Sequence, residues 1–151
     1  MKRKILSKRE IKDINEQLKI FNFEFDKKDH VELFEDSIKF LKLNGETYFL
    51  NIINTWVPCL KLLLKKEHLI PEIIVDMGAV KFVTSGADIM RPGIVSYPDN
   101  LLKDSVVVIK DVINHKPLAI GVSLMDSNTM CEITSGKAVK NIHYVGDEYW
   151  N

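Results

Sequence analysis

The sequence is poor in the residues on which disulfide-stabilised and zinc-binding proteins depend. It contains two cysteines in 151 residues, Cys59 and Cys131, and neither belongs to a C-x-x-C pair. None of the four histidines stands four positions from another. A disulfide framework and a zinc site are therefore not expected. We expect two buried free thiols in a reducing compartment instead.

An excess of charge of one sign is also missing. Lysine and arginine number 21 and aspartate and glutamate 21, which argues against a uniformly basic surface for nucleic acid. No stretch approaches the ~18 apolar residues of a membrane-spanning helix. The first 18 residues, MKRKILSKREIKDINEQL, lack the apolar segment of a signal peptide. We expect a cytoplasmic protein without membrane contact.

Motifs for catalysis are absent as well. The seven glycines form no P-loop, no dinucleotide fingerprint and no Gly-x-Ser-x-Gly elbow. Asp76 and Asp88 stand beside glycine turns, where a lone aspartate usually caps backbone N–H groups. We predict no catalytic residue, no cofactor and no metal site, and the chain is typical of a binding module rather than an enzyme.

The first half of the sequence contains helical and strand patterns in alternation. Residues 4–22 have a helical apolar period, and Ser7 and Glu10 have the spacing of a capping box. Residues 30–53 alternate polar and apolar positions around Asn44-Gly45, a strong hairpin signal. Residues 54–71 are predicted to form a second helix with Pro58 in its first turn.

The pattern of residue types and charge changes near Ile70-Pro71, where we place a domain boundary. Residues 1–71 hold 14 basic and 11 acidic residues, whereas residues 72–151 hold 7 and 10. The second half predicts a compact barrel or sandwich with two short helices, because short β-branched segments recur in it. Its strand segments are 72–75, 105–112, 117–124 and 140–146, and its helices are 78–86, stopped by Gly86, and 126–133, closed by Gly136.

The segment VDMGAVKFVTSGADIMRPGIV resembles the signature of PUA domains, small β-barrels first described in pseudouridine synthases and archaeosine transglycosylases. Lys116–Ser123, KPLAIGVS, is similar to a later strand of the same domain. The positions that carry the signature are Gly78, Ala79, Gly86, Ala87, Asp88, Met90, Pro92, Gly93 and Ile94.

The chain further resembles the malignant T-cell-amplified and translation-machinery-associated family, in an archaeal-type form, through residues 57–82 and the ending GKAVKNIHYVGDEYW. This resemblance implies an α+β protein with a small α/β N-terminal domain, residues 1–71, and a C-terminal PUA domain with a mixed β-barrel, residues 72–151. It also implies RNA binding in translation, with tRNA or rRNA, the small ribosomal subunit and a density-regulated-protein-like partner as expected contacts.

The resemblance places RNA along the first helix of the PUA domain, residues 79–84, and the loop that follows. Gly86 and Ala87 leave room for a sugar–phosphate chain to approach backbone N–H groups. Lys81 and Arg91 can neutralise phosphates. The full set of candidate RNA-binding residues is Lys81, Ser85, Gly86, Ala87, Arg91, Lys137, Lys140 and His143, each of which has a purely structural alternative.

Other residues leave further alternatives open. Phe49 and Trp56 are candidate partner contacts or core residues, and Met90 is expected to pack inside the barrel. The basic N-terminus is either a contact for rRNA or a plain helix start. The chain is then an RNA-binding translation factor, a protein-interaction adaptor that uses the barrel as a scaffold, or a non-catalytic accessory subunit of RNA modification. The basic residues at the N-terminus are Lys2, Arg3, Lys4, Lys8 and Arg9.

Overall fold

The computed structural model describes residues 1–150, which divide into two compact units. The first unit comprises Met1–Leu69 and the second begins at Ile70. No helix among the described residues is long and apolar enough to cross a membrane.

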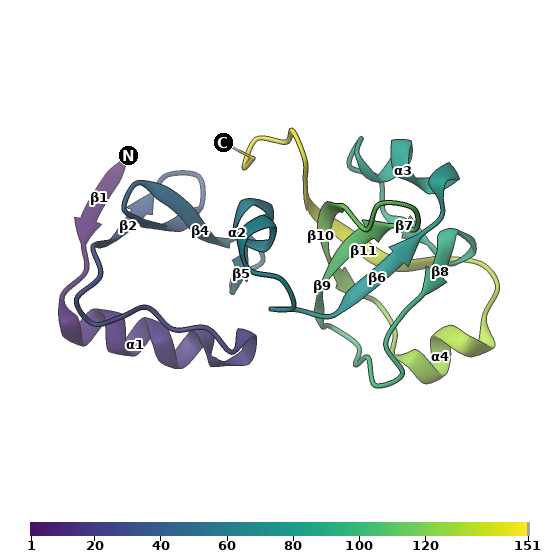
Figure 1. Ribbon diagram of the computed structural model, residues 1–151, viewed down its shortest axis with the longest axis horizontal. Helices are drawn as coiled ribbons and strands as arrows, with labels where there is room; N and C mark the ends of the chain where they lie inside the picture. Colours follow the sequence, from purple (N-terminus) through teal and green to yellow (C-terminus); the bar gives the residue numbers. More distant parts are fainter. Residues whose placement is uncertain (151) are drawn as a thin grey trace. The chain divides into compact units, whose positions relative to one another are not determined.

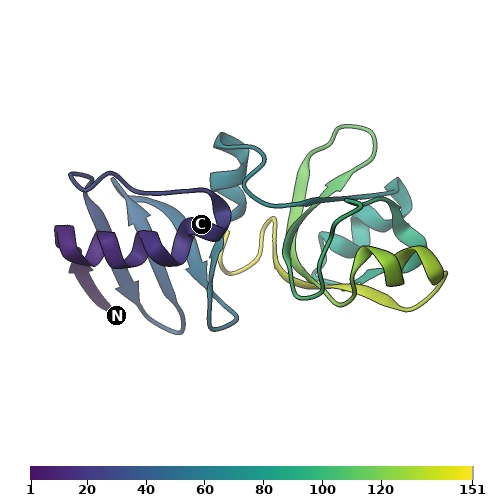
Figure 2. The same ribbon diagram turned by 90° about the horizontal axis from the view of Figure 1, so that it is seen from below.

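The first unit is a five-stranded antiparallel sheet in the order β1-β2-β3-β4-β5, with helix α1 across one face (Figures 1 and 2). The predicted capping box is confirmed, since Ser7 Oγ accepts the N–H of Glu10 and the Glu10 carboxylate accepts the N–H of Ser7. Its elements are β1 (Lys2–Ile5), α1 (Lys8–Leu18), a 3₁₀ turn (Lys19–Phe21), β2 (Val31–Glu35), β3 (Lys39–Leu43), β4 (Glu46–Asn51), β5 (Trp56–Pro58) and α2 (Leu60–Lys65).

Two predictions for this unit need correction. The helix expected over residues 4–22 is shorter, because Lys2–Ile5 pairs with β2 as an edge strand. The helix expected over residues 54–71 is reduced to α2, because Trp56–Pro58 pairs with β4. Phe49 and Trp56 are 0% and 6% exposed, so both are core residues and not partner contacts.

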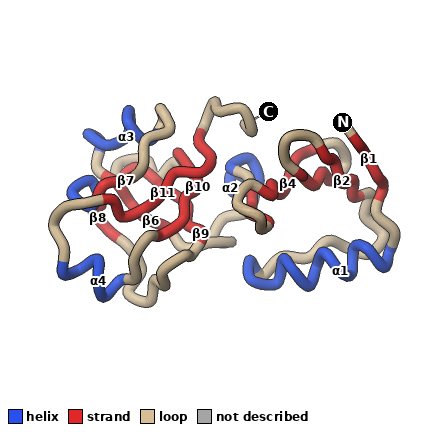
Figure 3. Tube along the Cα trace, turned by 180° about the vertical axis from the view of Figure 1, so that it is seen from behind, coloured by secondary structure: helices blue, strands red, loops and turns tan. Residues whose placement is uncertain are grey.

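The second unit is a curled mixed sheet in the order β7-β11-β10-β9-β6-β8, in which only β6 and β9 pair in parallel among the described strands (Figure 1). Figure 3 shows α3 and α4 outside the strands. The predicted α+β class with a mixed, curled sheet is confirmed. The elements are β6 (Glu72–Val75), α3 (Met77–Val83), β7 (Ile89–Met90), a 3₁₀ turn (Arg91–Gly93), β8 (Ile94–Ser96), β9 (Val106–Asp111), β10 (Pro117–Ser123), α4 (Ser127–Glu132) and β11 (Lys137–Tyr144).

The core of the second unit joins the sheet to both helices. Val83 of α3, Met130 of α4 and Val139 of β11 pack in one buried cluster with the central strands. The two thiols differ from the prediction, because Cys59 is buried but Cys131 is exposed on α4.

Candidate nucleic-acid interface

Helix α3 is short and well capped. The carboxylate of Asp76 accepts the N–H of Ala79 at 2.9 Å, which satisfies a donor that the first turn leaves free. The helix ends at Val83, and Gly86 follows with a φ of +92°, a conformation that glycine adopts without strain. The predicted stop at Gly86 is confirmed. The loop Thr84–Ala87, called the α3 loop below, then leads to β7.

Every backbone N–H of the α3 loop is used within the protein. Thr84 donates to Val80 O and Ser85 to Phe82 O, at 2.9 and 3.1 Å. Gly86 donates to Val83 O and Ala87 to Phe82 O, both at 3.0 Å. The N–H groups of Gly86 and Ala87, which were expected to face phosphates, therefore close the end of the helix instead.

Two side chains join the α3 loop to β11. The amide nitrogen of Asn141 donates to Val83 O and to Ala87 O, both at 3.0 Å. Asp88 holds the same strand, because its Oδ1 accepts the N–H of Asn141 at 3.0 Å. The structural role expected for Asp88 is confirmed. We call Asp88 and Asn141 the loop latch.

The glycine in the loop also permits a close contact. A Cβ at Gly86 would lie 2.8 Å from Cε1 of Tyr144, so the loop lies directly against the Tyr144 ring at the end of β11. The candidate loop is thus fixed by packing as well as by the latch.

A groove of about 600 Å³ runs beside α3 and the loop, with a mostly apolar lining. Phe82 and Met90, which both line it, are 57% and 46% exposed. Met90 therefore does not pack inside the barrel as expected. Ala87, Asp88 and Lys137 line the same groove, so residues distant in sequence meet there.

Three of the predicted cations are exposed near these elements. Lys81 lies on α3, and Lys137 and Lys140 lie on β11. Lys137 Nζ forms an ion pair with Asp88 Oδ2 at 3.3 Å, although its side chain remains 63% exposed. Ser85 is exposed too, but its hydroxyl donates to Lys81 O at 2.7 Å.

Arg91 has a different position from the one expected. Its Nε donates to Met130 O at 2.8 Å and its Nη1 donates to Ile94 O at 3.2 Å. The guanidinium also lies over the Tyr97 ring, 5.4 Å from its centre. These contacts fix the half-buried Arg91 between α4 and β8, so its guanidinium is not a free phosphate ligand.

His143 is buried and is not available at the surface. It is 1% exposed, and its Nδ1 lies 2.9 Å from Asp147 Oδ2. Burial lowers the pKa of His143, while the hydrogen bond and the charge of Asp147 oppose this shift. The predicted contact of His143 with RNA does not fit this burial. The Asp147 carboxylate also accepts the N–H of Tyr149 at 2.9 Å, so the pair holds the segment after β11.

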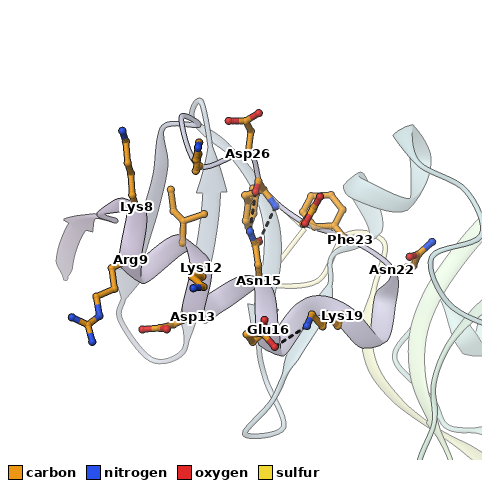
Figure 4. A pocket seen from close by; sticks show the side chains of 14 residues that line it. Lys8, Arg9, Lys12, Asp13, Asn15, Glu16, Lys19, Asn22, Phe23 and Asp26 are labelled. Carbon is orange, nitrogen blue, oxygen red and sulfur yellow. Dashed lines mark hydrogen bonds and ion pairs between the residues drawn. The ribbon is translucent and has the colours of Figure 1, made fainter.

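The first unit contains a second hollow, of about 1210 Å³, along α1 and the segment that follows it (Figure 4). Asn15 joins the two sides, with its Nδ2 donating to Phe25 O and its Oδ1 accepting the N–H of Phe25. Lys8 and Arg9 of the basic N-terminus line the hollow, but its lining includes five basic and four acidic residues in all. Mixed charge of this kind does not favour a phosphate site.

The most informative residues missed by the sequence analysis are Phe82 and Asn141. The sequence pattern predicts Phe82 to be a core residue, because it is apolar and lies in a helix. The side chain is nevertheless exposed on the short helix α3. Asn141 stands in the middle of a strand, where asparagine is disfavoured, and that position was the available signal. Among residues 1–150, no group of three or more His, Cys, Asp or Glu could hold a metal ion.

Comparisons with known proteins agree with this architecture. The model of the PUA domain matches residues 71–145. The chain is 39% identical to an uncharacterized protein of Methanocaldococcus jannaschii, over 99% of this chain and 96% of the relative. Identity to translation machinery-associated protein 20 of Saccharomyces cerevisiae is 36%, over 83% and 74% of the two chains. Malignant T-cell-amplified sequence 1 of Rattus norvegicus is 35% identical, over 83% and 72%.

Solved structures give the same result. A PUA domain from Aeropyrum pernix, crystallised as a tartrate complex, superposes with a TM-score of 0.85 at 25% identity, over 99% of this chain and 89% of that one. An H/ACA ribonucleoprotein bound to a substrate RNA matches 64% of this chain and 29% of its own, with a TM-score of 0.52 at 27% identity. The chain therefore belongs to the family of PUA-domain proteins that includes translation machinery-associated protein 20 and malignant T-cell-amplified sequence 1.

Proposed function

We propose that this chain is an RNA-binding protein of translation and that RNA binds along α3, the α3 loop and β11. The observation that carries this proposal is the apolar groove with half-exposed Phe82 and Met90, beside exposed lysines. Unpaired bases bind to exposed aromatic and apolar side chains, while lysines bind phosphates. Lys81, Lys137 and Lys140 supply the charge, and a binding role is favoured over catalysis.

The relatives support the translation context. The relative from Saccharomyces cerevisiae carries translation machinery in its name, and a ribonucleoprotein with a similar domain holds a substrate RNA. We infer that the chain acts in the cytoplasm on tRNA or rRNA, at the small ribosomal subunit. A density-regulated-protein-like partner belongs to the same proposal, as the family resemblance implies.

The affinity is expected to be modest. The second half of the chain carries 7 basic and 10 acidic residues, so few cations face the phosphates. With only ~3 phosphate contacts, the slope of log affinity against log salt is expected to be about −2 to −3.

The test is a titration of a tRNA transcript at several salt concentrations with wild type and with Lys81→Ala/Lys140→Ala. Because two phosphate contacts are lost, the slope of log affinity against log salt is expected to become shallower by roughly 1.4 to 1.8. The control is Lys103→Ala/Lys116→Ala, which removes the same charge from exposed lysines of the same unit. Equal affinity and slope in the two double variants would place RNA elsewhere.

The same experiment addresses the alternative of a protein-interaction adaptor. If wild type binds no tRNA and no rRNA at low salt, the adaptor is favoured. The mostly apolar lining of the groove is the observation that fits such a role.

A further inference from the structure

The hydrogen bonds of the α3 loop leave an unequal balance of free donors and acceptors. Its four N–H groups all donate within the protein, as described above. Its two hydroxyls are used as donors too, since Thr84 Oγ1 donates to Val80 O and Ser85 Oγ to Lys81 O. No donor of Thr84–Ala87 remains for a ligand.

The acceptors of the loop differ. Ala87 O accepts from Asn141, but within residues 1–150 the carbonyl oxygens of Thr84, Ser85 and Gly86 accept no hydrogen bond from the protein. Ser85 is exposed and Thr84 and Gly86 are half-buried, so these carbonyls belong to a surface loop. The loop also follows the C-terminus of α3, where the helix dipole is negative.

We propose that the α3 loop recognises hydrogen-bond donors of an unpaired ribonucleotide, and that it does not bind phosphate. This inference rests on the proposed RNA-binding function. RNA offers two kinds of donor that suit free carbonyls, namely the ribose 2′-hydroxyl and the exocyclic amino groups of bases. Phosphates carry acceptors alone, so they are left to the lysines of α3 and β11.

The loop latch is what keeps this surface in place. One amide nitrogen of Asn141 binds the carbonyls on both sides of the loop, Val83 O and Ala87 O. The three free carbonyls lie between these two anchored ones in the chain. Asn141 is therefore a positioning residue, which acts on the ligand through the loop.

The ligand-side test uses wild-type protein and an RNA hairpin with a single-stranded extension. In one arm the unpaired sugars are changed from 2′-hydroxyl to 2′-fluoro, which keeps the RNA sugar pucker but cannot donate. In the other arm the unpaired adenines and cytosines are replaced by analogues without the exocyclic amino group. We expect at least one arm to weaken binding about three- to tenfold per group removed.

The arm that responds identifies the donor. Affinity unchanged in both arms overturns the inference while leaving the proposed function intact. Absence of any binding by the unmodified hairpin and by tRNA counts against the proposed function itself. The two failures are thus distinguishable.

The protein-side test compares Asn141→Ala with Asn128→Ala, an exposed asparagine on α4. For each protein, the affinity for the unmodified hairpin is divided by the affinity for the modified RNA that wild type binds more weakly. Release of the latch in Asn141→Ala is expected to lower this ratio without changing the salt slope. A ratio measured on one protein does not depend on how much of that protein is folded. If Asn141→Ala weakens both ligands equally, the loop does not read the donor and the inference is wrong.

Discussion

Lys137 is a cation with a partner already in place. Its ion pair with Asp88 sets a carboxylate beside the surface proposed to hold RNA. A phosphate that approaches Lys137 competes with this carboxylate and is repelled by it. Asp88 therefore both positions the loop and weakens the attraction of the surface for RNA.

Asp88→Asn is expected to bind RNA more tightly than wild type. The asparagine oxygen can still accept the N–H of Asn141, while the charge that engages Lys137 is removed. We expect the slope of log affinity against log salt to steepen by up to about 0.7 to 0.9, the value for a full phosphate contact, because Lys137 then meets RNA without competition from Asp88. The control is Asp99→Asn, an exposed aspartate in the same unit. An unchanged slope would mean that the charge of Asp88 does not limit the contact of Lys137 with phosphate.

His143 makes the stability of the second unit depend on pH. Burial lowers its pKa in the folded state, so the unfolded chain binds the proton more readily. Stability is therefore complete above the unfolded pKa of about 6.5 and falls as the pH drops below it.

The measurement is urea unfolding between pH 7.5 and 5 for wild type and His143→Gln. The variant is expected to lose the part of the pH dependence that lies just below about 6.5. Identical pH dependence in both proteins would contradict the assignment.

At the scale of elements, β11 supplies two of the three exposed lysines of the candidate site and the anchor of the α3 loop. It contributes Lys137, Lys140 and Asn141, and it lies between β7 and β10 in the sheet. The pairing of β10 with β11 contains a register shift between Ile120 and Gly121. A Cβ at Gly121 would lie 2.8 Å from Lys140 O and against the Val139 side chain.

Gly121→Ala is expected to destabilise the second unit by about 1–3 kcal/mol, because the added methyl group forces β11 away. The matched control is Gly78→Ala. Its Cβ would meet only Asp76 Oδ1 at 3.4 Å, and alanine favours a helix. Thermal unfolding followed by circular dichroism compares the two. Equal melting temperatures would contradict this account of Gly121.

The elements with strong local signals could be predicted from the sequence. The capping box of Ser7 and the stop at Gly86 depend on neighbouring residues alone. Trp56–Pro58 could not be recognised as a strand, because its pairing with β4 is a tertiary contact. The side-chain contacts of Arg91 and His143 could not be predicted either. Arg91 binds Met130 O and His143 binds Asp147, and the fold brings these partners together.

The position of the candidate site could be predicted from the sequence, but the hydrogen-bonding groups that it offers were not. The PUA signature indicated the helix and the loop, and three of the lysines are exposed as expected. The glycine at the end of the helix itself implied that the N–H groups of Gly86 and Ala87 bond to helix carbonyls, whereas the resemblance to PUA domains pointed to phosphate. The loop latch needs Asn141, 54 residues from Ala87 in the chain.

At the scale of the whole molecule, we propose that the unit from Ile70 onward is a domain that folds independently. Its buried cluster is built from its own residues, from Ile73 to Val139. A fragment beginning at Ile70 is expected to unfold in one cooperative transition with the native pattern of amide chemical shifts. A fragment without dispersed amide shifts would show that the first unit is required.

The loop latch also has a consequence for the time at which this protein becomes active. The loop is synthesised first, and Asn141 follows more than fifty residues later. A chain still emerging from the ribosome therefore has α3 but not the strand that fixes the loop. A protein proposed to work on the translation apparatus would have no finished RNA surface while it is itself being made, and nascent copies would not compete with mature ones.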